Sequence, residues 1–99
     1  MQDSSTEIAI EIVNRNRLDV IVFVVHDGIS TRLGLATAST TTELKMPLRL
    51  LGAGREYQLV GHPIGMRINV TTERLHALAG DEVTWSLEDS FQRSTVVVR

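Results

Sequence analysis

Histidine and methionine side chains are the residues from which this chain could build a metal site. Imidazole and thioether groups can bind copper without a thiolate. The candidates are His26, His62, His76, Met46 and Met66. His62 lies four positions before Met66, but the histidines fall in different turns and share no recurring ligand spacing. Solvent-facing loop histidines explain the pattern better, so we expect no metal and no other cofactor.

A second group has the residue types of a hydrolase. His26, Asp27 and Ser30 could supply the base, the orienting acid and the nucleophile of a catalytic triad. They gather on one predicted hairpin tip, and no Gly-x-Ser-x-Gly nucleophile elbow is present. The acidic pairs Asp81-Glu82 and Glu88-Asp89 are the other candidates, but neighbours along a strand point to opposite faces. We therefore predict that the protein is not an enzyme.

Composition excludes several further classes. The 99 residues include 10 Lys+Arg and 12 Asp+Glu, a net charge of −2, which argues against a polycationic nucleic-acid binder. The longest apolar run, Val20 to Val25, is far shorter than the ~20 residues of a membrane-spanning helix. The chain has no cysteine and therefore no disulfide framework. Its four aromatic residues are too few for a sugar-binding or base-stacking strip.

Length and periodicity predict one all-β domain. Residues 1–6 form a polar N-terminal leader, which we expect to be flexible, and residues 7–99 form the domain. Period-two alternation and turn residues predict short strands without a long helix. The expected strands are residues 7–12, 18–25, 29–37, 40–46, 55–61, 66–70, 82–88 and 94–98. Asp27-Gly28 predicts a tight hairpin. Residues 48–51 fit a helical turn or a loop, and residues 73–79 fit a helical turn or a strand.

This pattern of strands and turns is typical of an antiparallel sandwich. We predict a single antiparallel Ig-like (Greek-key) β-sandwich of seven to eight strands. Val83, Trp85 and Leu87 alternate on one side of their strand, so Trp85 is interpreted as the anchor of the core rather than as a platform for a ligand.

Two stretches resemble known small β-sandwich proteins. Gly80-Asp81-Glu82-Val83-Thr84-Trp85 resembles the Gly-Asp-x-Val-x-Trp strand of secreted Greek-key domains, both cupredoxin-like and Ig-like. The stretch from Val13-Asn14 through Val20–Val24 to Thr31-Arg32-Leu33-Gly34 resembles a layout of small exported bacterial sandwich proteins. The resemblance implies a non-enzymatic protein in an extracellular or periplasmic setting. A blue-copper centre needs a cysteine, so the cupredoxin likeness extends to the fold alone.

Two apolar stretches exceed what a core requires. Val20 to Val25 is apolar on both faces, and Val96-Val97-Val98 is a second such run. Either both are central strands, covered by the second sheet and by loops such as Leu48 to Leu51, or they offer an edge or a face to another chain. The interface candidates are Val20, Val22, Phe23, Val24, Val96, Val97 and Val98.

The sequence therefore predicts a structural or interaction module. Its partner would be a protein, either a second copy or another subunit of an extracellular or envelope assembly, bound through a strand edge or an apolar sheet face. One alternative is a glycan or peptide binder that uses the loops at Asp27-Gly28, Ser39, His62-Pro63 and Ser90. A small metal carrier that uses His and Met is the other alternative. Nucleic acid, membrane-spanning and small-molecule roles are not expected.

Overall fold

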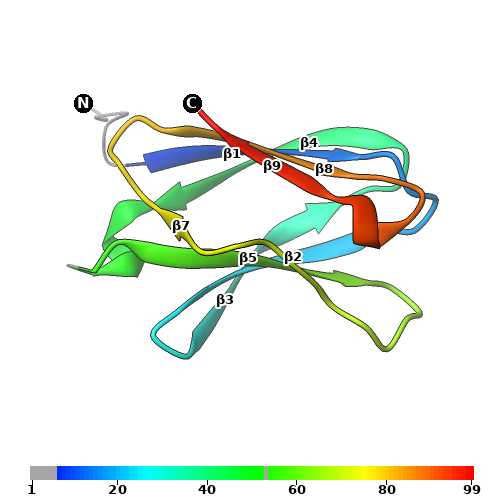
Figure 1. The fold of residues 1–99 in the computed structure, drawn as a ribbon, viewed down its shortest axis with the longest axis horizontal. Coiled ribbons are helices and arrows are strands. Elements are labelled where there is room, and N and C mark those ends of the chain that lie inside the picture. The colour runs from blue at the N-terminus through cyan, green and yellow to red at the C-terminus, as the bar shows by residue number, and fades with distance from the viewer. Residues whose placement is uncertain (1–6, 53) are drawn as a thin grey trace.

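The computed structural model describes residues 7–52 and 54–99, so the predicted leader lies outside the described residues. Within those ranges the chain forms nine strands and two short 3-10 helices, which confirms the prediction of a mostly β chain (Figure 1). No helix there is long and apolar enough to cross a bilayer. The elements are β1 (Glu7–Asn14), β2 (Val20–His26), β3 (Ile29–Ala36), β4 (Thr40–Pro47), η2 (Leu48–Leu51), β5 (Glu56–Pro63), β6 (Val70–Thr71), β7 (Leu75–His76), β8 (Glu82–Leu87), η3 (Phe91–Arg93) and β9 (Thr95–Val98).

The strands form two sheets. The first, named here the β1 sheet, has the order β4-β1-β8-β9, and the second, the β2 sheet, has the order β3-β2-β5-β6 with β7 also paired to β5. β1 and β8 run parallel, with Ile12 opposite Trp85. The prediction of a wholly antiparallel fold is therefore wrong at this pair. A parallel pair needs a long crossover, and here the excursion through strands β2 to β7 supplies it.

One core fills the space between the two sheets. Alternate residues of each central strand point into it, and Trp85 is fully buried, which confirms its predicted place. The indole lies over Gly61 of the opposite sheet. A Cβ on Gly61 would stand 2.8 Å from Val20 Cγ1 and 3.2 Å from the indole ring, so glycine allows the sheets this close approach. The other hydrophobic strand residues that are 0% exposed are Ile8, Ile10, Ile12, Val20, Val22, Val24, Ala36, Met46, Leu59 and Leu87.

Turn chemistry holds the strand ends. Asp27 and Gly28 have φ of 48° and 77°, which suits a type I′ turn and confirms the predicted hairpin. The buried Asn14 side chain donates to the carbonyls of Leu18, at 2.9 Å, and Ala36, at 3.1 Å. Asn16 accepts from the Leu18 amide at 3.1 Å and donates to two carbonyls that follow β8. These amides join β1, β2, β3 and β8 at one end of the molecule.

One predicted strand is confirmed only at its end. Residues 66–70 alternate in polarity, but only Val70–Thr71 pairs with β5. β5 continues to Pro63, beyond its predicted end, and Gly65 with φ of 88° turns the chain away from it. Ile68 has no strand to pack against and is 50% exposed. The alternation of residues 66–69 therefore reflects no sheet pairing.

Candidate interaction surfaces

The two alternating sets of side chains on β2 lie on opposite sides of the sheet. Val20, Val22 and Val24 are 0% exposed because β2 lies between β3 and β5, and this set packs against the β1 sheet. These three residues are corrected from interface candidates to core residues, because they have no surface to offer a partner. Phe23 belongs to the other set and is half-buried on the outer side of the sheet.

The outer side of the β2 sheet is apolar at its centre. Ile21, Phe23 and Val25 follow one another along β2 and are half-buried. Leu35 of β3 stands opposite Ile21 and is 39% exposed, and Val60 of β5 stands opposite Phe23. We call these five residues the apolar face. The sequence suggested that residues 48–51 could cover the outer side of β2. In the structure, Leu48 and Leu51 instead pack into the core.

Polar side chains border the apolar face. Arg32 is exposed and stands opposite Phe23 in the β2–β3 ladder. His62 stands opposite Ile21, and its Nδ1 lies 2.9 Å from Asn69 Oδ1. Gln58 stands opposite Val25. An apolar centre with an aromatic ring, an arginine and a polar rim has the composition typical of protein–protein interfaces.

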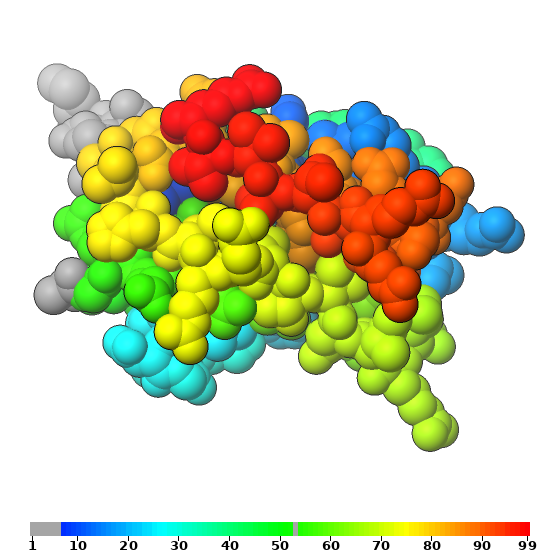
Figure 2. Space-filling model, in the orientation of Figure 1, coloured from blue at the N-terminus to red at the C-terminus, as the bar shows by residue number. Residues whose placement is uncertain are grey.

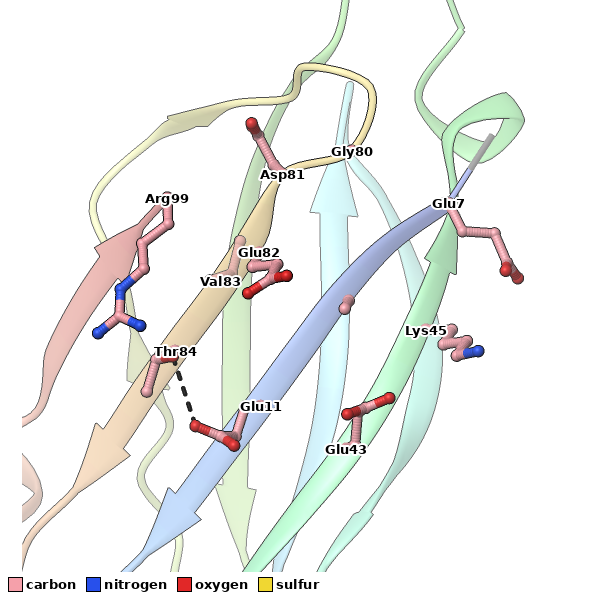
Figure 3. A pocket seen from close by; sticks show the side chains of 11 residues that line it. Glu7, Glu11, Glu43, Lys45, Gly80, Asp81, Glu82, Val83, Thr84 and Arg99 are labelled. Atoms are coloured by element: carbon pink, nitrogen blue, oxygen red, sulfur yellow. Dashed lines mark hydrogen bonds between the residues drawn. The ribbon is translucent and has the colours of Figure 1, made fainter. Parts of the chain in front are cut away.

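The outer side of the β1 sheet is charged and hollowed. A depression of about 460 Å³ lies over Ala9, whose small side chain stands between Lys45 of β4 and Glu82 of β8. Figure 3 shows carboxylates from neighbouring strands around it. Glu11 and Glu43 are directly opposite one another, and Thr84 Oγ1 lies 3.5 Å from Glu11 Oε1. The charged residues that line the depression are Glu7, Glu11, Glu43, Lys45, Asp81, Glu82 and Arg99.

The second apolar run lies on an edge strand. β9 pairs with β8 on one side only, so Val96 to Val98 border the β1 sheet. Val97 and Val98 are 49% and 40% exposed, whereas Val96 packs against the core. The sequence allowed each apolar run to be either a central strand or an edge strand. In the structure, residues 20–25 belong to the central strand β2, and residues 96–98 belong to the edge strand β9.

The metal and catalytic candidates do not converge. Within the described residues no three His, Asp or Glu side chains are placed to share a metal ion. Met46 is fully buried in the core, and His62 lies on the outer side of the β2 sheet. His26 Nδ1 lies 3.9 Å from Asp27 Oδ2, but Ser30 stands opposite Val25 and so faces the other side of the sheet from His26.

The loops considered for glycan binding lie at two ends of the molecule. β2 begins at Val20, opposite Pro63, and ends at His26, next to the Asp27-Gly28 turn. The Ser39 amide donates to the Asn16 carbonyl at 3.1 Å, and Asn16 also contacts the chain just before Ser90. Ser39, Pro63 and Ser90 therefore belong to one end and Asp27-Gly28 to the other, so the four loops form no common site.

Tyr57 is a buried polar residue that the sequence did not single out. It is 2% exposed, and its hydroxyl has no hydrogen-bond partner among the described residues. Desolvation, followed by the nearby charge of Asp81, raises the pKa of Tyr57 to about 12. The hydroxyl therefore stays protonated near neutral pH and contributes no base. The sequence signal that could have identified this buried hydroxyl is a tyrosine on the inward side of a predicted strand.

Comparison with known proteins assigns no family to this chain. No protein-family model matches the sequence, and a search of the curated proteins finds no match. The resemblance to exported β-sandwich proteins therefore remains a prediction that rests on the residues that carry it.

Proposed function

We propose that this chain is a non-catalytic structural or interaction module that associates with copies of itself through the apolar face of the β2 sheet. The observation that carries the proposal is the outward set of the central strand β2. Ile21, Phe23 and Val25 are all large and apolar, although none of them is needed to fill the core. Apolar side chains grouped on an outer sheet face favour association with another apolar surface.

Charge favours a second copy as the occupant. Of the residues that stand opposite Ile21, Phe23 and Val25 in the two ladders, Arg32 is the one arginine, and none is a lysine, an aspartate or a glutamate. Two such faces can therefore meet without a cluster of like charges. The outer side of the β1 sheet, where Glu11 stands opposite Glu43, would instead repel its own copy.

The proposal includes the setting and the finer fold. We place the module in an extracellular or periplasmic assembly, as the resemblance to exported sandwich proteins implies. We also assign the two sheets to an Ig-like Greek-key sandwich. The chain passes from one sheet to the other between β1 and β2, β3 and β4, β4 and β5, and β7 and β8, and such crossings support this assignment.

Sedimentation equilibrium of the wild type and the Phe23→Glu variant tests the proposal. A carboxylate at the centre of the apolar face would be desolvated on association, so we expect the dissociation constant to rise at least about tenfold. Val13→Glu is the matched control, because Val13 is a half-buried valine on the outer side of β1, an interior strand of the other sheet. It should leave association unchanged.

Two results would contradict the proposed function. One is a wild type that stays strictly monomeric at about 100 μM, a concentration at which an interface worth about 6 kcal/mol would already form. The other is equal loss of association in Phe23→Glu and Val13→Glu, because the contact would then not distinguish the two faces. Thermal unfolding of both variants confirms that each remains folded.

A further inference from the structure

The edge strand β9 lacks the features that keep other sheet edges from pairing. Charged residues, prolines, bulges and short length protect edges from a second chain. β3 has Arg32 and a register shift opposite Val22/Phe23, β4 has Glu43, Lys45 and a terminal Pro47, and β6 and β7 have two residues each. β9, Thr95–Val98, has four residues and contains no charge, no proline and no bulge.

The opposite side of the molecule is closed by its own strands. β3 and β4 are the edges there, and they contact one another across the two sheets. A Cβ on Gly34 of β3 would lie 2.7 Å from Leu44 Cδ2 of β4. Figure 2 shows β9, in red, uncovered on the side facing the viewer. Of the edges described, β9 is therefore the one both open and apolar.

The hydrogen bonds to β8 determine which backbone groups of β9 point outward. Arg99 N donates to Glu82 O at 2.8 Å, and Glu82 N donates to Arg99 O at 3.0 Å. In an antiparallel ladder such pairs alternate, so Val97, opposite Thr84, also directs its amide and carbonyl toward β8. The amides and carbonyls of Val96 and Val98 therefore point away from the sheet.

We propose that β9 pairs with β9 of a second copy, antiparallel, about a two-fold axis at Val97. In this register Val96 exchanges both backbone hydrogen bonds with Val98 of the second copy, and the two Val97 side chains meet on the outer side. Thr95 stands opposite Arg99, so no like charges face each other. A shift by two residues would place Arg93 opposite Arg99 and Val97 opposite Thr95, which charge and packing both disfavour.

A further exposed apolar residue lies beside this edge. Leu78 is 61% exposed and belongs to a turn in which the Asp81 amide donates to the Leu78 carbonyl at 3.0 Å. The turn leads directly into Glu82, the partner of Arg99 in the β8–β9 ladder. Leu78 thus lies near the start of β8, at the end of the edge where β9 finishes.

Edge pairing joins two β1 sheets into one continuous sheet. This contact stands apart from the apolar face, and its existence does not depend on the proposed function. If both contacts form, each copy has two different two-fold interfaces, and such a chain builds assemblies larger than a dimer. That last consequence rests on the proposed function.

Single cysteines test the register, because the natural chain contains no cysteine. Non-hydrogen-bonded antiparallel pairs have Cα atoms about 4.5 Å apart, within the range of a disulfide. Val97→Cys should therefore form a covalent dimer under mild oxidation at least about tenfold faster than Thr95→Cys, because Thr95 of one copy lies four residues along the strand from Thr95 of the other. Thr95 is exposed on the same strand and reports random collisions.

The outcomes are separable from those of the proposed function. Equal cross-linking of Val97→Cys and Thr95→Cys, or none in Val97→Cys, would overturn the edge pairing. Adding Phe23→Glu to Val97→Cys removes the apolar-face contact and should leave the cross-linking rate of the folded protein unchanged. Cross-linking in that double variant supports edge pairing. This conclusion holds even if the sedimentation of Phe23→Glu shows that the apolar face does not mediate association.

Discussion

β1 and β2 each lie inside their own sheet, and they differ most on the sides that face away from the core. Their inward sets are alike, because both sheets contribute to one apolar core. The outward sets contrast: Glu7, Ala9, Glu11 and Val13 on β1 include two carboxylates, whereas Ile21, Phe23 and Val25 on β2 are all large and apolar. Folding dictates the inward sets, whereas it leaves the outward sets largely free. The contrast between the outward sets therefore bears on what each sheet meets in solution.

The shared core is the premise of this comparison, and Gly61→Val tests it with the largest expected effect. Its first added carbon would stand 2.8 Å from Val20 and 3.2 Å from Trp85. We expect a loss of about 3 kcal/mol in the free energy of unfolding, because a tightly packed core resists added volume. Urea denaturation measures it. Gly54→Val is the control, because a Cβ there meets nothing within 4 Å; equal destabilisation would contradict the close contact of the sheets.

The titration of Tyr57 tests the core separately from the two outer faces. Its pKa of about 12, against 10.0 for an exposed tyrosine, means that the unfolded chain loses this proton first. Stability should therefore be unaffected below pH 10 and fall by about 2 kcal/mol as the pH rises to 12. Tyr57→Phe should lack this part of the decline. Tyr57 is the one tyrosine in the chain, so tyrosinate absorbance reports its titration directly.

A midpoint near pH 10 for that absorbance in the folded protein would contradict the burial of Tyr57. Alkaline stability curves of Tyr57→Phe and the wild type that coincide would do the same. Tyr57 points into the core and lies on neither outer face, so association of Tyr57→Phe should match that of the wild type.

The smallest effect concerns the charged side. Glu11 and Glu43 face each other across β1 and β4, and like charges in this position are destabilising. Glu43→Lys should raise the free energy of unfolding by about 0.5 kcal/mol at low salt, with the gain reduced at high salt. Thr41→Lys is the control, because it adds a cation to the same strand opposite Val13. A similar gain in Thr41→Lys would show that net charge, rather than the pair, is responsible.

Local patterns predicted the elements with a strong period or turn signal. Asp27-Gly28 set its hairpin because both residues tolerate positive φ. Val83, Trp85 and Leu87 were assigned to the core by alternation alone, and all are buried. The residues 73–79 fitted two structures equally, and the short β7 is one of them.

Long-range choices could not be predicted from these patterns. β2 is apolar on both sides, so alternation divides its residues into two sets without saying which set is inward. The position of the opposite sheet decides this, and it places Val22 inside and Phe23 outside. The parallel pairing of β1 with β8 is likewise a tertiary arrangement between strands distant in sequence. No local propensity records it.

Methyl-resolved NMR spectra of the wild type across a dilution series test the central claim most directly. If copies meet through the apolar face, the methyl signals of Ile21, Val25 and Val60 should shift with concentration, while those of Val13 and Thr41, which are opposite one another on the other sheet and away from β9, stay constant. Signals that are independent of concentration up to about 1 mM, at which a contact worth about 4 kcal/mol would be substantially formed, would contradict the account. So would shifts confined to the charged side of the β1 sheet.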